Sequence, residues 1–172
     1  MMRALILSIT LVLTSTLFAL PTDRLELAYV EADLVNIDSQ TALGHYEGHV
    51  KFAQGSSHLT ADKVKTQFNE QHHLTYAIAE TTLPELTHFW IQPQLNAPLF
   101  HAYATTIEYF PDKHLLILTG SAHIAQGDNK LSAPIIQYHL DSKQLTTTKS
   151  GNEKTHIWVN PTKDAYGHTR SP

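Results

Sequence analysis

The chain of 172 residues contains no cysteine. This absence excludes a disulfide framework and thiol chemistry, and it fits any compartment. Positive charge is also scarce, because 12 Lys and Arg face 16 Asp and Glu, for a net charge of −4. A nucleic-acid partner normally requires a basic patch, so we expect no nucleic-acid binding.

Catalytic motifs are missing as well. The sequence has no Gly-x-Ser-x-Gly nucleophile setting and no phosphate-binding glycine loop. Its 12 histidines are scattered without the spacing of a metal site. We therefore expect no metal, no cofactor and no enzymatic activity, with most histidines on solvent-facing strands and turns.

Helical periodicity is absent beyond the N-terminus, which itself has the pattern of a secretory signal peptide. Arg3 precedes an apolar run from Ala4 to Leu13, and smaller residues lead to Ala19. We predict a signal peptide at 1–19, one β domain at 20–161 and a flexible tail at 162–172. An uncleaved membrane anchor is the alternative for the first segment, although its apolar core is short for a bilayer span.

What the sequence does contain is a duplication. The stretch 46–55, centred on Gly48 and ending in Gln-Gly, matches 118–127, centred on Gly120, without a gap. The offset is 120 − 48 = 72 residues, and like residues stay in that frame over roughly fifty positions. One strand-rich unit was therefore duplicated.

Alternating short segments separated by turn residues predict an all-β antiparallel sandwich, roll or barrel. The apolar phase within 58–68 shifts, which predicts a β-bulge near Asp62. We expect Gly48 and Gly120 to let the long strands bend. The proline-rich region 81–97 links the two units and has one or two strands of its own, including 86–91.

One set of apolar residues is expected to point inward. It is either a dry core or the lining of an interior that takes hydrocarbon chains, and alternation alone does not separate the two. The set is Val35, Ile37, Val50, Phe52, Leu59, Val64, Phe68, Tyr76, Ile107, Tyr109, Leu116, Leu118, Ile124, Leu131, Ile136 and Tyr138.

The duplicated motif resembles the repeat of the OstA-like family of lipopolysaccharide export proteins. The likeness is carried by the glycine-centred strand and by the runs 59–64, 104–109 and 115–122. It implies an open, twisted antiparallel β-jellyroll in the periplasm, built from two OstA-like repeats. Such proteins carry lipopolysaccharide from the inner membrane to the outer-membrane translocon, with acyl chains in the apolar interior.

The resemblance also implies partners. Family members join LptC-like and LptD-like proteins, and they form head-to-tail homo-oligomers. Lipid phosphates would be met by local cations such as Lys51, Lys63 and Lys65. Alternatives are an LptC-like component anchored in the inner membrane, a secreted jelly-roll hydrolase and a structural β-roll.

Overall fold

The computed structural model describes residues 26–160. Twelve antiparallel strands are joined by turns and by the longer loops 81–86, 92–99 and 149–155, with a 3-10 turn at Pro111–Lys113. The strands are β1 (Tyr29–Glu31), β2 (Leu34–Asp38), β3 (Leu43–Gln54), β4 (Ser57–Phe68), β5 (Leu74–Glu80), β6 (Thr87–Ile91), β7 (Phe100–Ala104), β8 (Thr106–Phe110), β9 (Leu115–Gln126), β10 (Asn129–His139), β11 (Gln144–Thr148) and β12 (His156–Trp158). None of the described residues forms a helix long and apolar enough to cross a membrane.

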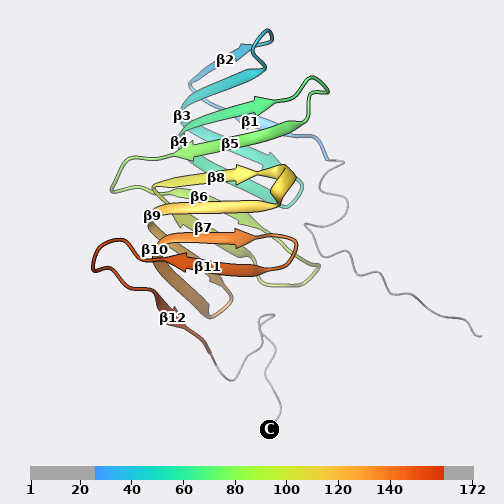
Figure 1. Ribbon diagram of the computed structural model, residues 1–172. Coiled ribbons are helices and arrows are strands. Elements are labelled where there is room, and N and C mark those ends of the chain that lie inside the picture. The colour runs from blue at the N-terminus through green and yellow to red at the C-terminus, as the bar shows by residue number, and fades with distance from the viewer. Residues whose placement is uncertain (1–25, 161–172) are drawn as a thin grey trace, which may run out of the picture.

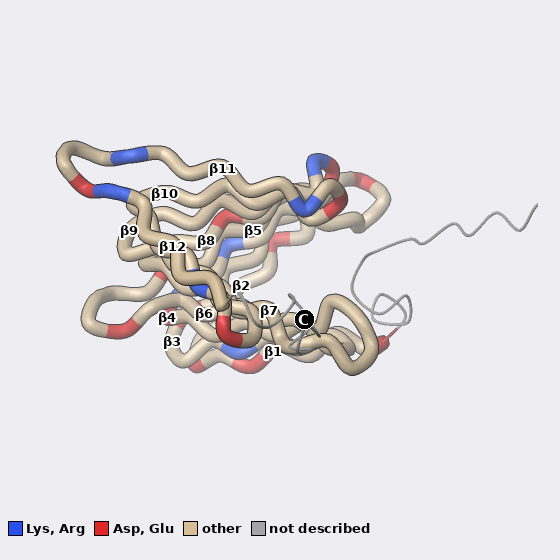
Figure 2. Tube along the Cα trace, turned by 90° about the horizontal axis from the view of Figure 1, so that it is seen from below, with Lys and Arg blue, Asp and Glu red and all other residues tan. Residues whose placement is uncertain are grey.

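The strands form two layers that share their four longest members (Figures 1 and 2). Sheet I runs β2-β3-β4-β5-β8-β9-β10-β11. Sheet II runs β1-β3-β4-β6-β7-β9-β10-β12. Each long strand therefore starts in one sheet and ends in the other, which gives the twisted jellyroll expected from the sequence.

Bulges mark the points where the long strands change sheets. Between β3 and β4, Gly48 and His49 lie opposite Asp62 alone, because the pairing shifts between Glu47 and Val50. The β9–β10 pair has the same defect between Ala133 and Ile135. Gly48 and Gly120 both have φ +77°, a conformation that suits glycine. The predicted bulge at Asp62 and the bends at both glycines are confirmed.

The duplication is visible in the strand boundaries. Adding 72 to the bounds of β3 (43–54) gives those of β9 (115–126), and adding 72 to β2 (34–38) gives β8 (106–110). One backbone bond recurs at the same offset: Asp33 N–H donates to Gly48 O at 3.0 Å, and Thr105 N–H to Gly120 O at 2.8 Å. The two units therefore have the same local architecture.

The interior contains two apolar clusters of unequal size. The larger, in the second unit, has nine buried residues, among them Leu118 and Ile136 with no exposed surface. The smaller, in the first unit, comprises Val50, Ala61, Val64 and Ala79. Burial of this apolar surface is the main stabilising contribution to the fold.

One strand at the start of the second unit was not expected from the sequence. The predicted strand at 86–91 is β6, but β7 was not predicted from the sequence. Its alternating Phe100, Ala102 and Ala104 are buried. Two of these three are alanines, so the apolar phase is faint in the sequence.

Candidate functional site

The candidate site is the inner face of the jellyroll, where directly paired residues form continuous rows because partners opposite one another share a face. On sheet II one apolar row crosses all eight strands. It consists of Val30, Phe52, Leu59, Phe89, Ala102, Ile124, Leu131 and Ile157. We call this row the sheet II inner row.

Sheet I contributes a parallel inner row. It consists of Val35, Tyr46, Val64, Ala79, Ile107, Leu118, Ile136 and Thr147. Its central members, from Val64 to Ile136, are buried. The sheet II inner row differs, because Phe52, Leu59, Phe89, Ile124 and Leu131 are only half-buried. Of these two rows, the one on sheet II therefore presents more accessible apolar surface.

The predicted lining residues fall into three groups by burial. Buried are Val50, Val64, Ile107, Leu116, Leu118 and Ile136. Half-buried and inward are Phe52, Leu59, Phe68, Tyr109, Ile124, Leu131 and Tyr138. Inward but exposed, on the edge strand β2, are Val35 at 50% and Ile37 at 65%.

Tyr76 is the exception, and its expected inward orientation is corrected. It pairs with the exposed Gln67, and its hydroxyl donates to Glu108 Oε1 at 2.7 Å on the outer face. Partial burial and this carboxylate raise the pKa of Tyr76 to about 12. The inward residues of β5 are Ala77 and Ala79, which pair with inward residues of β8.

Both ends of the inner rows are open. At the N-terminal end, β1 and β2 expose Val30, Leu34, Val35 and Ile37. At the C-terminal end, a cleft of about 200 Å³ is lined by Phe100, Ile124, Leu131, Tyr138, Ile157 and Trp158, among others. Burial raises the pKa of the Tyr138 hydroxyl, which keeps that group neutral.

A larger cleft, of about 450 Å³, lies beside the second bulge. Its lining mixes Ser121, Ser132 and Pro134 with Glu153 and Lys154 of the β11–β12 loop. This polar lining sets it apart from the apolar inner rows.

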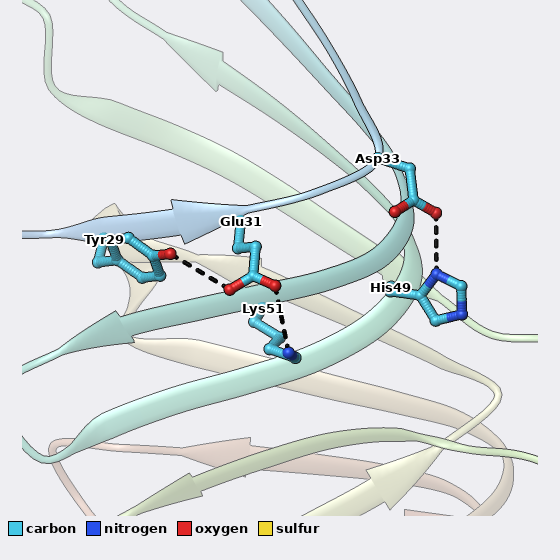
Figure 3. A network of polar contacts seen from close by, with 5 residues as sticks. All are labelled: Tyr29, Glu31, Asp33, His49 and Lys51. Carbon is cyan, nitrogen blue, oxygen red and sulfur yellow. Dashed lines mark hydrogen bonds and ion pairs between the residues drawn. The ribbon is translucent and has the colours of Figure 1, made fainter.

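Charges lie on the outside. Lys51 Nζ is 3.3 Å from Glu31 Oε1, and Lys63 Nζ is 3.6 Å from Glu47 Oε1. The first of these pairs is part of a network at the N-terminal bulge, where Tyr29 also contacts Glu31 (Figure 3). Lys51 and Lys63 thus have carboxylate partners on the surface, and the expected role of Lys51, Lys63 and Lys65 with lipid phosphates stays a prediction.

The described residues contain no group of three or more His, Asp or Glu side chains that could hold a metal ion. Four histidines nevertheless gather on the outer face of sheet II, which the sequence did not reveal. Stacked imidazole and aromatic rings cover this face, and His88 lies among them with the pKa lowered to about 4 by burial and by neighbouring His101 and His123.

Comparison with known proteins gives consistent matches. The family model described as LptA/(LptD N-terminal domain) LPS transport protein matches residues 29–144. The chain is 27% identical over 135 residues to the lipopolysaccharide export system protein LptH of Pseudomonas aeruginosa, covering 78% of this chain and 75% of LptH. It is 26% identical over 161 residues to LptA of Escherichia coli K12, covering 89% of this chain and 85% of LptA.

A solved structure shares the fold. The crystal structure of LptH from Pseudomonas aeruginosa, titled as the LptA-homologous periplasmic component of the lipopolysaccharide transport device, superimposes with a TM-score of 0.73 at 21% identity. The match covers 82% of this chain and all of that one.

Proposed function

We propose that this chain binds lipopolysaccharide in the periplasm and carries it between the two membranes. The chain belongs to the family of LptA and LptD N-terminal-domain lipopolysaccharide transport proteins. LptH and LptA, to which the chain is similar, are lipopolysaccharide export proteins, and LptH is a periplasmic component. These relatives are transport proteins, in agreement with a binding rather than a catalytic role.

The observation that supports this function is the uninterrupted sheet II inner row. It passes from Val30 at one edge to Ile157 at the other without a charged side chain. Removing an acyl chain from water contributes about 0.8 kcal/mol per methylene, so a continuous apolar row lets the chains move along without a large barrier. The sugars and phosphates would remain outside.

The half-buried members of this row are the proposed acyl-chain contacts. Phe52 and Ile124 occupy equivalent places in the two units, since 52 + 72 = 124. The buried members of the sheet I inner row, such as Leu118 and Ile136, instead form packed core that supports the lining. The predicted signal peptide at 1–19 and tail at 162–172 lie outside the described residues.

Photo-crosslinking in living cells tests this proposal. A photoreactive residue replaces Phe52, Ile124 or, as an outward control, His123, which directly precedes Ile124. We expect lipopolysaccharide adducts at the two inward positions and none at the control. Adducts at His123 with none at Phe52 and Ile124 would show that the inner row is not the binding site.

We further propose that the open ends join neighbouring Lpt proteins or a second copy of the chain. Each end presents edge strands beside exposed apolar residues, such as Ile37 at one end and Ile157 at the other. An edge strand can pair with a strand of another chain through its backbone. Contact between unlike ends does not close, so it produces a filament.

The end-to-end proposal predicts a concentration-dependent mass. We expect light scattering to show larger species as concentration rises, and Ile37→Asp to shift them toward monomer because it places a charge in the contact. An exposed outward control is Gln67→Asp. If both variants assemble like wild type, the N-terminal edge is not the contact.

A further inference from the structure

The outer face of sheet II is unusual in composition. Four of its neighbouring segments, 57–61, 87–91, 100–104 and 122–126, contain no Asp, Glu, Lys or Arg. Apart from Thr60 and Ala125, the outward positions that pair across these strands carry rings. We call these residues the outer ladder: His58, His88, Trp90, His101, Tyr103 and His123.

Pairing between strands brings the outer ladder together. His88 of β6 lies directly opposite Tyr103 of β7, and Trp90 lies opposite His101. His88 and His101 are therefore diagonal neighbours on one face. Ring centroids are 4.1 Å apart for His88 and Tyr103, 4.4 Å for His88 and Trp90, and 5.2 Å for His88 and His101.

The two imidazoles also meet at their nitrogens. His88 Nε2 and His101 Nδ1 are 3.0 Å apart and share one proton in a hydrogen bond. If a metal ion were bound to both nitrogens at about 2.0–2.1 Å, the N–metal–N angle would be about 94°. This angle fits square-planar or tetragonal coordination. The rings are nearly parallel, 19° apart, and their hydrogen-bonded nitrogens face each other, so both rings would have to turn for their lone pairs to converge on one ion.

We propose that His88 and His101 form a two-imidazole site for a divalent late transition-metal ion. Imidazole nitrogen is a preferred ligand of such ions, and Cu²⁺ binds most tightly in the Irving–Williams series of divalent first-row metals. Water completes the coordination shell. The imidazole that donates the hydrogen bond changes tautomer, so that its proton lies on the ring nitrogen away from the metal. Both imidazoles therefore stay neutral when the ion binds.

Neighbouring rings hold the orientation of His88, whose imidazole stacks on both Trp90 and Tyr103 at centroid distances of 4.4 and 4.1 Å. The other two ladder histidines pack on these flanking rings. His123 stacks on the far side of Tyr103 and its Nδ1 lies 3.1 Å from Ser121 O, while His58 stacks on Trp90.

The position of the pair gives the ion a structural role. β6 belongs to the link after the first unit, and β7 begins the second unit. A metal on His88 and His101 would therefore clamp sheet II where it passes from one repeat to the next. The proposal rests on the outer face alone and does not depend on lipopolysaccharide binding by the inner face.

Cu²⁺ titration of the untagged full-length chain tests the site. The chain has two tryptophans, so Trp158→Phe leaves Trp90 as the only indole reporter. Because Trp90 stacks on His88, Cu²⁺ on this pair should quench its fluorescence in a saturable, one-to-one manner. His88→Gln and His101→Gln should each weaken binding by about tenfold or more, since each removes one of two ligands.

Two controls distinguish the site from other histidines. The adjacent His72 and His73 lie in the β4–β5 turn, and replacing both with Gln should leave quenching of Trp90 unchanged. Urea midpoints without metal should confirm that all variants fold. Quenching that never saturates, or that is equally strong in His88→Gln and His101→Gln, would overturn the proposal.

Discussion

Gly120→Ala tests whether the second bulge requires glycine for two separate reasons. The first is its φ of +77°, which costs an L residue about 1–2 kcal/mol. The second is space, because an added methyl would overlap Thr105 Oγ1. That hydroxyl donates to Thr119 O at 2.9 Å, and losing this bond costs about 0.5–1.5 kcal/mol. We expect a total loss of about 2–3 kcal/mol in the free energy of unfolding.

Equilibrium urea unfolding measures this loss, with Gly151→Ala as the matched control. Gly151 has φ +59° and nothing within 4 Å of an added Cβ, so only the backbone cost of about 1–2 kcal/mol should appear. Thr105→Ala removes the obstructing hydroxyl, and in the double variant with Gly120→Ala the steric part of the loss should disappear.

If Gly120→Ala costs no more than Gly151→Ala, an added methyl does not clash at the second bulge. If Thr105→Ala leaves the cost of Gly120→Ala unchanged, the Thr105 hydroxyl is not the obstacle. The first unit offers an independent repeat of the experiment, because a methyl on Gly48 would overlap Asp33 Oδ2.

Three further perturbations follow from the packing and the titrating groups. Leu118→Ala, at a side chain with no exposed surface, should lower the free energy of unfolding in urea by about 2–5 kcal/mol. A loss under about 1 kcal/mol would contradict tight packing around Leu118. Thr87→Val should cost about 1 kcal/mol, because the buried hydroxyl donates to Thr81 Oγ1 at 3.1 Å, whereas exposed Thr82→Val serves as the neutral control. The lowered pKa of His88 means that the unfolded chain binds a proton more readily, so metal-free stability should fall as pH drops from 6.5 to about 4. The fall of the His88 pKa from 6.5 to about 4 corresponds to about 3.4 kcal/mol, and partial exposure reduces the expected loss to about 1–2 kcal/mol. His88→Gln should lose that part of the pH dependence, and identical pH profiles would contradict this assignment.

The repeat and its bends were predictable because short stretches of sequence are enough to identify both. The match around Gly48 and Gly120 gives the offset, and the phase shift around Asp62 gives the bulge. The inward face of β5 was not predictable in this way. Its inward positions are the small Ala77 and Ala79, while the larger Tyr76 faces outward, so apolar size indicated the wrong face.

The outer ladder could not be predicted for a different reason. His88 and His101 are 13 residues apart and come together only through the pairing of β6 with β7. β7 is only five residues long, and two of its three buried positions are the small Ala102 and Ala104. Leu116 and Leu118 of β9 lie on the inner face as predicted, although they stand in the continuous apolar run 115–118.

The unequal division of the interior has a dynamic consequence. Nine buried residues hold the second unit together, but only four hold the first, where the short edge strands β1 and β2 are exposed along their length. Local opening free energies follow such differences in burial. Amide hydrogens of β1 and β2 should therefore exchange with solvent through frequent partial unfolding, while those of central β9 and β10 wait for global unfolding. The N-terminal rim can thus fray and re-form while the central strands β9 and β10 remain folded.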